Sequence, residues 1–399
     1  MEGLRFIILG AGPSGLAFAH TLKSRGENSF LVLEKESEAG GLCRSADVDG
    51  SPLDIGGGHF LDIKKEQVLD LLFQFMPRSE WQEYSRISKI RIRNREIDYP
   101  LEANLWQLPT EDQIDFLESI AQAGCVCGAA MPGAFESWIN WKLGKCIAEE
   151  YMLPYNRKIW SIDLNELGTY WLAKLPDVSF RDVLRSCITG RPYGSLPAHE
   201  RFLYPKKYGY GEVWKRIGQD LGDQLLTNTP VTRIDVPGKI INERYRAKTI
   251  ITTIPWTLWP QVAEVPVDVR TAIGKLRYTS IDVDYHRGSL ATKAHWVYDP
   301  DEKLAYHRIL CRANFCLGSM GYWTETNPQR SRNSGDWRYR NEFAYPLNTH
   351  DKPEAMAMVL NWAKRNSIIG LGRWGTWEHM NSDVAVSHAI AEATNLTEG

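Results

Sequence analysis

Three glycines near the start of the chain have the spacing that binds the pyrophosphate of a dinucleotide. Gly10 can make a tight turn, Gly12 lets phosphate approach the backbone, and Gly15 allows a helix to pack closely on a strand. Glu34 follows about twenty residues later, where a carboxylate can accept hydrogen bonds from ribose hydroxyls. The types and spacing of these residues predict a dinucleotide-binding site.

The segments around these residues predict the elements that such a site needs. Residues 4–9 form a short apolar run, typical of a buried parallel strand, that leads directly into the first glycine. Residues 16–22 have helical character, so the N-terminus of a helix would face the phosphates. Residues 30–34 indicate a second strand that ends in the acid. The order of these segments predicts a complete Rossmann-type unit of strand, helix and strand.

Two further glycine-rich segments favour FAD over NAD as the dinucleotide. Residues 38–44 follow the acid closely and contain Gly-Gly-Leu, and residues 54–60 contain three consecutive glycines. Consecutive glycines let backbone come close to a flat ring system. The first segment resembles that of a large group of FAD proteins, which includes amine oxidases, protoporphyrinogen oxidase, phytoene desaturases and UDP-galactopyranose mutase. In that group the second segment lies beside the isoalloxazine ring, so the resemblance implies a bound FAD.

The composition argues against several other classes of function. The 399 residues carry a formal net charge of -2, which gives no reason to expect nucleic acid or a membrane surface as a partner. Seven cysteines form no C-x-x-C pair and no zinc spacing, so we expect neither a metal site nor a disulfide framework. We also expect no signal peptide and no membrane-spanning stretch, which together with reduced thiols predicts a cytoplasmic protein.

The predicted elements place the fold in the α/β class with a discontinuous first domain. Helical spacing of apolar residues in 66–73 and 112–121 predicts a helical region, and residues 249–254 predict a later strand of the first domain. Residues 382–394 predict a C-terminal helix, and alternation within 277–345 predicts a substrate-binding sheet. We expect a Rossmann-type FAD-binding domain from residues 1–65, 200–265 and 355–399, a mainly helical domain from 66–160, and an antiparallel substrate-binding sheet from 161–199 and 266–354.

Several segments, taken in order, are similar to those of UDP-galactopyranose mutase over nearly the whole chain. Residues 155–160 resemble its Y-x-x-K-x-W element, and residues 204–211 resemble its glycine-rich segment before a helix. Residues 306–309 resemble the segment with a diphosphate-binding arginine, 344–347 the Y-P element, and 372–383 the C-terminal flavin motif. The resemblance depends on the shared order and spacing of these segments.

The resemblance implies interconversion of the pyranose and furanose forms of a nucleotide-diphosphate sugar, with N5 of the reduced flavin as the nucleophile. The departing diphosphate must stay close, and an arginine offers it paired donors. Arg308 is at the matching position, and Tyr345 could add a hydrogen bond. Trp160 could form a wall against the sugar or nucleotide, and His59 could tune the reduced flavin. For each of these residues an ordinary structural role is the alternative.

A further set of residues is implied as contacts of the FAD. These residues lie in the glycine motifs, beside the predicted strands and in the C-terminal flavin motif. The set is Gly10, Gly12, Pro13, Ser14, Gly15, Glu34, Lys35, Gly41, Leu42, Gly57, Gly58, His59, Val231, Gly372, Arg373, Asn381 and Ser382. For Arg373 the alternative is a salt bridge in solvent.

Two departures from the mutases concern the diphosphate site. The mutases carry a second diphosphate arginine after an apolar and proline stretch, and residues 174–178 have no arginine at the matching place. Arg181 follows shortly after and could replace it. The mutases also have a tyrosine beyond the C-terminal flavin arginine, at the position where this chain has His379. These changes leave the nucleotide open between UDP, GDP and TDP, and leave the sugar open.

Two other functions are compatible with the sequence. An FAD oxidase or desaturase of the amine-oxidase or protoporphyrinogen-oxidase type would remove hydride from its substrate and pass electrons to oxygen. A flavin-binding or assembly protein without catalytic activity is the third interpretation. An oxidase or desaturase of this type would be expected to have an apolar substrate tunnel. This chain has arginine and tyrosine residues there, which favours the mutase. The physiological reductant and homo-oligomerisation stay open.

Overall fold

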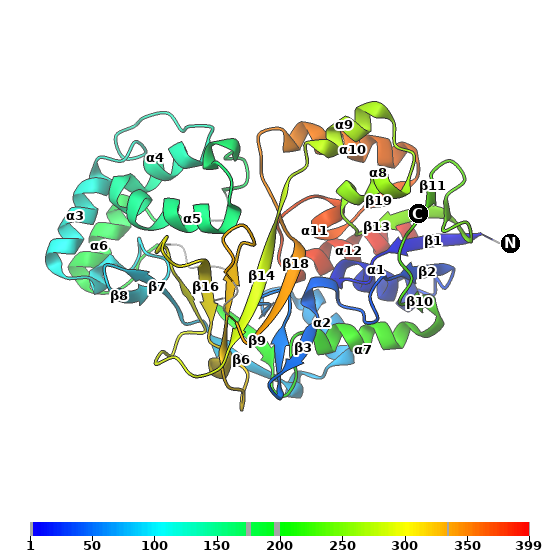
Figure 1. Cartoon of the computed structure of the whole chain (residues 1–399), viewed down its shortest axis with the longest axis horizontal. Coiled ribbons are helices and arrows are strands. Elements are labelled where there is room, and N and C mark those ends of the chain that lie inside the picture. Colours follow the sequence, from blue (N-terminus) through cyan, green and yellow to red (C-terminus); the bar gives the residue numbers. More distant parts are fainter. Residues whose placement is uncertain (1–2, 173–176, 195–199, 333–334, 399) are drawn as a thin grey trace.

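The molecule is built from two large sheets and a group of helices. The structure is a computed structural model that describes residues 3–172, 177–194, 200–332 and 335–398. Figure 1 shows the helical region at one end of the long axis, the Rossmann-type sheet at the other, and long antiparallel strands between them. This mixed α/β architecture confirms the predicted fold class. Within the described ranges, no helix has the length and apolar character needed to cross a bilayer.

A mainly parallel sheet forms the dinucleotide-binding region. Its central strand carries Phe6 and Ile8 toward one face, where they join one hydrophobic core, and Ile7 and Leu9 toward the other face, where they join a second core. Burial on both faces is typical of a central parallel strand. In sheet order the strands are β10 (Leu225–Leu226), β2 (Phe30–Leu33), β1 (Leu4–Leu9), β13 (Tyr245–Thr252), β12 (Ile240–Ile241) and β11 (Ile234–Asp235), with β19 (Ile368–Gly370) paired to β13.

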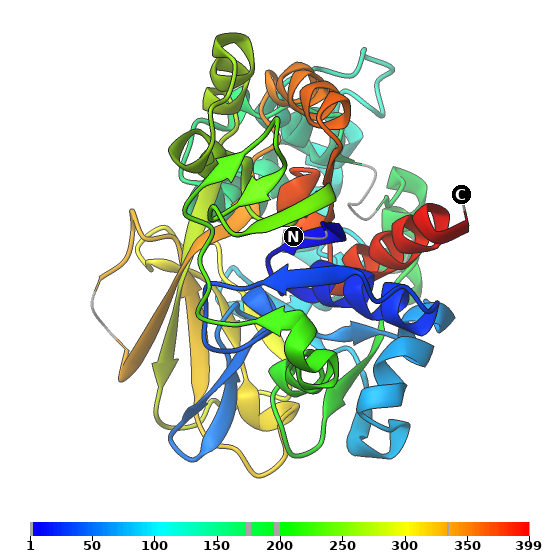
Figure 2. The ribbon, with the colours of Figure 1, turned by 90° about the vertical axis from the view of Figure 1, so that its right-hand side faces the viewer.

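Helices cover both faces of this sheet. On the face of Phe6 and Ile8, the C-terminal helix lies against α1, as Figure 2 also shows. On the other face, Trp362 packs edge to ring on Trp256 and Trp259, and these three tryptophans belong to the same core as Ile7 and Leu9. The first group consists of α1 (Pro13–Ser24), α2 (Glu66–Phe75), α7 (Gly211–Leu221) and α12 (Ser382–Glu398), and the second of α8 (Trp259–Val262), α9 (Val267–Gly274) and α10 (Lys352–Arg365).

The second large sheet is mainly antiparallel and stands between the helical region and the first sheet. Its central strands are largely buried, and β7 alternates between half-buried positions and the buried positions Ser88, Ile90 and Ile92. One parallel pair, β7 with β15, joins the N-terminal part of the sheet to the rest. In sheet order the strands are β18 (Trp337–Pro346), β14 (Tyr278–His286), β17 (Tyr322–Thr326), β16 (Tyr306–Leu310), β15 (Trp296–Tyr298), β7 (Ser88–Ile92) and β8 (Arg95–Asp98).

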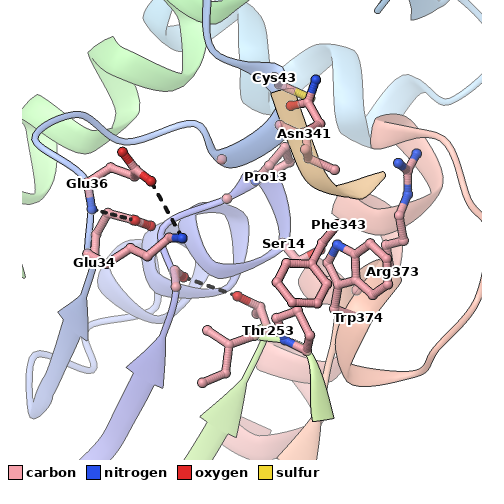
Figure 3. Close-up of a pocket in the computed structure, with 18 of the residues that line it drawn as sticks. Pro13, Ser14, Glu34, Glu36, Cys43, Thr253, Asn341, Phe343, Arg373 and Trp374 are labelled. Carbon is pink, nitrogen blue, oxygen red and sulfur yellow. Dashed lines mark hydrogen bonds and ion pairs between the residues drawn. The ribbon is translucent and has the colours of Figure 1, made fainter. Parts of the chain in front are cut away.

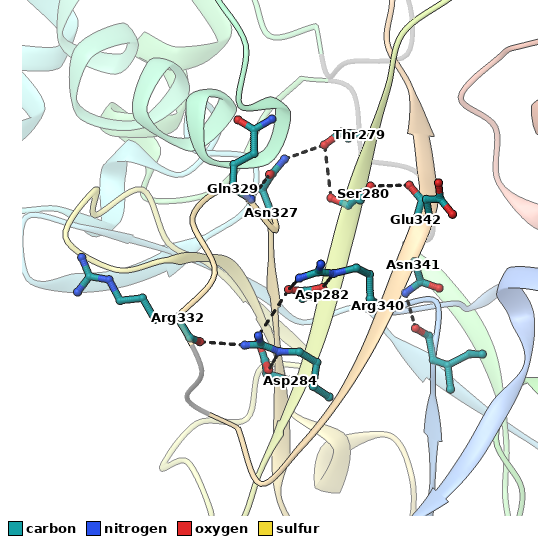
Figure 4. Close-up of polar contacts among 12 residues, drawn as sticks. Thr279, Ser280, Asp282, Asp284, Asn327, Gln329, Arg332, Arg340, Asn341 and Glu342 are labelled. Atoms are coloured by element: carbon teal, nitrogen blue, oxygen red, sulfur yellow. Dashed lines mark hydrogen bonds and ion pairs between the residues drawn. The ribbon is translucent and has the colours of Figure 1, made fainter. Parts of the chain in front are cut away.

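Ion pairs fix the register of β14 and β18, the two long strands of Figure 4. Arg338 and Arg340 lie opposite Asp284 and Asp282, and each guanidinium donates two hydrogen bonds to its partner's carboxylate at 2.6–3.1 Å. Both carboxylates are buried. A guanidinium that donates two hydrogen bonds compensates for the burial of a carboxylate. If the pairing of β14 and β18 shifted by one residue, both carboxylates would lose their arginine partners.

The helical region has its own hydrophobic core. Its helices pack around Phe116, Phe135, Ile139 and Trp160. Gly144, at φ 75°, kinks the second helix. The region contains α3 (Thr110–Ala121), α4 (Phe135–Ile147), the π-helical turn η4 (Ala148–Met152), α5 (Leu153–Trp160) and α6 (Phe180–Thr189).

Shorter strands connect the regions. A hairpin of β3 and β4 follows the first glycine motifs, and a three-stranded sheet of β5, β9 and β6 lies beneath it. The bounds are β3 (Ser45–Val48), β4 (Ser51–Asp54), β5 (Leu61–Asp62), β6 (Trp81–Ser85) and β9 (Arg201–Pro205).

The elements predicted for the dinucleotide unit are confirmed, and so is the C-terminal helix. The strand predicted at 249–254 is confirmed over 249–252, because β13 ends at Thr252. The stretch 66–160 differs from a purely helical region. β7 and β8 lie within it and join the second sheet, and α2 packs against α7 and α12. The cause is the alternation of buried residues in β7, a period-two pattern within a stretch otherwise dominated by helical periodicity. The residue boundaries of the three domains stay a prediction.

Candidate functional site

A cavity of about 500 Å³ opens where β1, β2 and β13 end. Gly10 has φ +100°, a conformation that favours glycine, and a Cβ on Gly15 would lie 2.1 Å from the carbonyl oxygen of Gly10. A Cβ on Gly12, by contrast, would meet no atom nearer than 4.0 Å. Among the described residues, no side chain caps the N-terminus of α1. Open space at Gly12 beside uncapped helix N–H groups fits a pyrophosphate, as the sequence predicts.

Glu34 holds the glycine loop from the end of β2. One carboxylate oxygen accepts a hydrogen bond from the N–H of Ala11 at 2.7 Å, and the other accepts from the N–H of Glu36 at 3.0 Å. A carboxylate offers about four acceptor positions, so these bonds leave capacity for ribose hydroxyls. Figure 3 shows Glu34 and Glu36 on one side of the cavity, across from Phe343, Arg373 and Trp374.

Most of the residues predicted to contact FAD line this cavity. Gly15 lies behind the glycine loop, and Gly58 and Asn381 line a second cavity described below. Gly57 is not among the described residues that line either cavity, and a Cβ on it would lie 2.4 Å from Oε1 of Glu325. The residues that line the first cavity are Gly10, Gly12, Pro13, Ser14, Glu34, Lys35, Gly41, Leu42, His59, Val231, Gly372, Arg373 and Ser382.

Sequence reasoning missed the wall of this cavity formed by β18 and the segment after β13. Thr253 donates a hydrogen bond to the carbonyl oxygen of Leu9 at 2.8 Å, and Asn341 donates one to the carbonyl oxygen of Ile55 at 2.6 Å. Phe343 packs on Trp374. These residues come from strands that only the folded chain brings together, and no local motif marks them.

Asp54 anchors the three-glycine segment from its first position. This fully buried carboxylate accepts hydrogen bonds from the hydroxyls of Ser45 and Tyr204 and from the N–H of Tyr210, at 2.6–3.0 Å. Burial raises the pKa of Asp54 to about 7, although these three hydrogen bonds act in the opposite direction.

The raised pKa of Asp54 predicts how stability changes with pH. Between pH 3.8 and about 7 the folded protein keeps a proton on Asp54 that the unfolded chain releases, so this group lowers the free energy of unfolding as pH rises through that window. Asp54→Asn should remove a decline on the order of a few kcal/mol. Urea unfolding of both proteins across the window is the measurement, with exposed Asp47→Asn as the control. An unchanged pH slope in Asp54→Asn would contradict this assignment.

The second cavity, of about 630 Å³, lies between the helical region and the second sheet. Leu42, His59, Arg373 and Ser382 line both cavities, so the two meet at these side chains. A ligand in the second cavity would therefore lie against the end of a ligand in the first. The three-glycine segment forms part of this junction because Gly56 and Gly58 line the second cavity.

Arg308 projects into the second cavity from β16 and is held by a buried carboxylate. Its Nε donates to Oε2 of Glu325 at 2.9 Å, and its Nη2 donates to the same oxygen at 2.5 Å. The side chain of Arg308 is 19% exposed and that of Glu325 is 1% exposed. Burial acts to raise the pKa of Glu325, but Arg308, His307 and the N–H of Gly58 together lower it to about 2. The pair stays ionised, which orients the guanidinium.

Tyr345 enters the second cavity from β18 of the same sheet. Its ring packs on Trp160 and on His379, with centroids 6.0 and 4.9 Å apart, and the guanidinium of Arg373 lies 5.5 Å from its centre. Burial, followed by the charge of Glu325, raises the pKa of Tyr345, so its hydroxyl keeps the proton and can donate. Trp160, His379 and Tyr345 all line the second cavity, as does Arg308.

Arg373 and His59 form the junction of the two cavities. Arg373 donates to the carbonyl oxygens of Ala344 and Met380, each at 2.8 Å, and is half-buried, with these partners inside the protein rather than a salt bridge in solvent. Burial, followed by the charge of Arg373, lowers the pKa of His59 to about 4, so the imidazole is neutral near pH 7. Its Nδ1 lies 3.1 Å from the carbonyl oxygen of Gly57 and must carry the proton.

Arg181 lies elsewhere. It is exposed on α6 and is not among the described residues that line the second cavity. Residues 174–176 belong to the stretch in which this chain has no match for the second diphosphate arginine of the mutases, and they are outside the described ranges.

Sequence reasoning missed another arginine of the cavity wall, Arg86. Its guanidinium lies over the rings of Tyr99 and Trp296, at 4.7 and 4.8 Å, and donates to the hydroxyl of Tyr298 at 3.3 Å. Tyr298 is in register with Arg308 across β15 and β16, so Arg86 and Arg308 lie on the same wall. A lone arginine before β7 carries no motif, and only the sheet order places it here.

Comparison with known proteins first defines the class of fold. Residues 8–75 match a family model described as an NAD(P)-binding Rossmann-like domain. The whole chain superimposes on a putative protoporphyrinogen oxidase from Exiguobacterium sp. 255-15, with a TM-score of 0.71, 13% identity, and coverage of 100% of this chain and 99% of that chain. It also superimposes on cyclohexylamine oxidase from Brevibacterium oxydans IH-35A, with a TM-score of 0.67, 14% identity and 99% coverage of each chain.

Within that class the chain is also similar to a particular kind of protein. A crystal structure of reduced UDP-galactopyranose mutase matches with a TM-score of 0.89 and 22% identity, over 100% of this chain and 94% of that chain. The UDP-galactopyranose mutase of Mycoplasma pneumoniae is 23% identical over 411 aligned residues, covering 98% of this chain and 96% of that protein. The resemblance predicted from separate segments is confirmed over the whole chain, and the fold is that of the mutase.

Proposed function

We propose that the protein is an FAD-dependent mutase that interconverts the pyranose and furanose forms of a nucleotide-diphosphate sugar. One observation carries the proposal: the glycine-lined cavity meets a second cavity at His59 and Arg373, and that second cavity contains Arg308. The similarity to UDP-galactopyranose mutase along 98% of the chain supports it.

The first cavity offers the groups that would hold FAD. Gly12 and the N-terminus of α1 would face the pyrophosphate, and Glu34 would accept from a ribose. The flat ring would lie where the cavities meet, near His59 and Arg373. When bound and reduced, a flavin supplies a nucleophilic nitrogen, N5, to the anomeric carbon of the sugar.

The second cavity offers the groups that would hold the substrate. Arg308, fixed by Glu325, would bind the diphosphate and keep it close for recombination after the anomeric bond breaks. Arg86 on the same wall supplies further positive charge. Tyr345 would donate a hydrogen bond, and Trp160 would pack against the sugar or nucleotide. Surrounding protein excludes water, which strengthens each polar contact.

The test is an anaerobic assay of the FAD-loaded protein after one reduction with dithionite. UDP-, GDP- and TDP-sugars are supplied in turn, and products are separated by chromatography. A mutase has no net redox change, so one reduction should support many turnovers without further reductant. If product instead forms only with oxygen and equals the oxygen consumed, the oxidase interpretation replaces the mutase. A protein that binds flavin but converts no nucleotide-sugar would contradict the proposal.

A further inference from the structure

The end of the second cavity on the side of the helical region is aromatic and carries two carboxylates, Glu102 and Asp177, of which Asp177 is paired with Lys142. Tyr298, Tyr155 and Tyr151 line this cavity together with Arg308, and the ring of Tyr155 lies 5.6 Å from that of Tyr298 and 5.8 Å from that of Tyr151. Glu102 lies beyond, close enough to Tyr151 for its charge to raise the pKa of the tyrosine hydroxyl. The sequence places Glu102 between the second sheet and α3, and neither the glycine motifs nor the mutase-like segments use it.

A tight turn fixes the position of Glu102. Its neighbours Leu101 and Ala103 are buried. The N–H of Asn104 donates to the carbonyl oxygen of Leu101 at 3.0 Å, and the Asn104 side chain donates to the carbonyl oxygen of Pro100 at 2.9 Å. The backbone on both sides of Glu102 is therefore held, and its half-buried side chain lines the cavity. A carboxylate fixed in this way is preorganised for a ligand.

Among the described residues, the charge that acts on Glu102 comes from a lysine that has its own partner. Lys142, the basic side chain whose charge acts on Glu102, has its ammonium 2.5 Å from Asp177. Tyr99 and Tyr151 lie close enough to Glu102 for its charge to act on their hydroxyls, and both line the cavity together with Phe135 and Met152. Burial raises the pKa of Glu102, against the opposing effects of its own N–H and of Lys142. A partly desolvated carboxylate gains most from a ligand that brings paired N–H donors.

We propose that this end of the cavity binds the nucleobase and that Glu102 selects guanine. The inference rests on the proposed function, because the diphosphate at Arg308 places the sugar toward the first cavity and the base toward the aromatic end. Aromatic rings suit the face of a base. Guanine presents two adjacent N–H donors, which a carboxylate accepts side by side. Uracil and thymine present one N–H between two carbonyl oxygens, which would face the carboxylate unfavourably.

The test measures binding of GDP, UDP and TDP to the FAD-loaded protein by calorimetry. GDP should bind at least about tenfold more tightly than UDP or TDP. Glu102→Gln retains one acceptor but places an amide donor against a guanine donor. The variant should therefore bind GDP about tenfold or more weakly than the unaltered protein, and should bind UDP equally or more tightly. Glu118→Gln, exposed on α3 and outside the cavity, should change neither affinity.

The pH dependence of binding separates this role from a structural one. GDP would bind the ionised carboxylate, so its affinity should fall as pH falls through the raised pKa of Glu102. Tyr99, Tyr151, Lys142 and Asp177 are the other titratable groups around this position. All four remain in Glu102→Gln, and nucleotide phosphates titrate equally with both proteins. The difference between the two pH profiles therefore reports Glu102 alone.

Each outcome decides the inference. The inference is supported if the unaltered protein prefers GDP and Glu102→Gln loses that preference. Equal or tighter binding of UDP or TDP by the unaltered protein overturns it and leaves the mutase proposal intact, as does an equal loss of all three nucleotides in Glu102→Gln. If none of the three nucleoside diphosphates binds, the inference and the mutase proposal both fail.

Discussion

A valine at position 12 is expected to leave the protein folded but unable to retain flavin. Gly12 has φ -75° and ψ 179°, an extended conformation that valine adopts readily. A Cβ there would meet no atom nearer than 4.0 Å, so the fold has room for the side chain. That room belongs to the cavity at the N-terminus of α1, where the pyrophosphate would lie. The valine therefore excludes the ligand without disturbing the protein.

The measurement is the flavin released on heat denaturation, as a ratio to protein. The ratio should fall from about one to near zero in Gly12→Val. Its melting temperature should match that of unaltered protein stripped of flavin, because a bound ligand stabilises only the folded state. Gly133→Val, in an exposed loop with no atom within 4 Å of the added Cβ, should keep both flavin and stability.

Gly15→Val provides the opposite case. Its Cβ would lie 2.1 Å from the carbonyl oxygen of Gly10 and 3.3 Å from the side chain of Ile8, so α1 could not pack on β1. This variant should fail to fold rather than only lose flavin. Full retention of flavin by Gly12→Val would show that the pyrophosphate does not occupy the predicted place.

Local signals were enough to predict the dinucleotide region. The glycine spacing, the apolar run before it and the acid after it lie within thirty-five residues, and each has a physical meaning that does not depend on the rest of the chain. β1, α1 and β2 appear where these signals place them.

Contacts between distant segments could not be predicted in this way. Glu325 reaches Arg308 only because β16 and β17 pair in one register, and it reaches Gly58 only because the glycine segment crosses the end of that sheet. Arg86 and Glu102 enter the second cavity through β7 and β8, strands within a stretch whose helical periodicity hid them. A single charged residue has no period and no motif, so its partner becomes visible only once strand order is known.

Loss of Arg308 is expected to weaken binding of the nucleoside diphosphate more than loss of any other side chain in the second cavity. A hydrogen bond between charged groups contributes on the order of 1.5–3 kcal/mol, so Arg308→Ala should weaken binding by roughly ten- to a hundredfold. Arg308→Lys should restore only part of the affinity, because an ammonium has no planar fork of donors. Flavin content should stay normal in both, since Arg308 does not line the first cavity.

The ion pair with Glu325 adds a second effect that must be separated from the first. Removal of Arg308 leaves a buried carboxylate that, among the described residues, keeps a hydrogen bond from the N–H of Gly58 and lies 3.6 Å from Nε2 of His307. An uncompensated buried charge costs about 3–5 kcal/mol of stability. Arg308→Ala combined with Glu325→Gln removes that charge, so the double variant should recover stability while its affinity for the nucleoside diphosphate stays low.

Arg338→Ala is the matched control for this experiment. Arg338 donates two hydrogen bonds to buried Asp284 in the same sheet, at 2.6 and 3.1 Å, and it is not among the residues that line either cavity. Its loss should lower the free energy of unfolding by a similar mechanism and leave nucleotide affinity unchanged. Titration calorimetry and urea unfolding of the four variants therefore separate binding from folding. If the double variant binds the nucleoside diphosphate as tightly as the unaltered protein, Arg308 serves only the fold, and Arg86 becomes the arginine that holds the diphosphate.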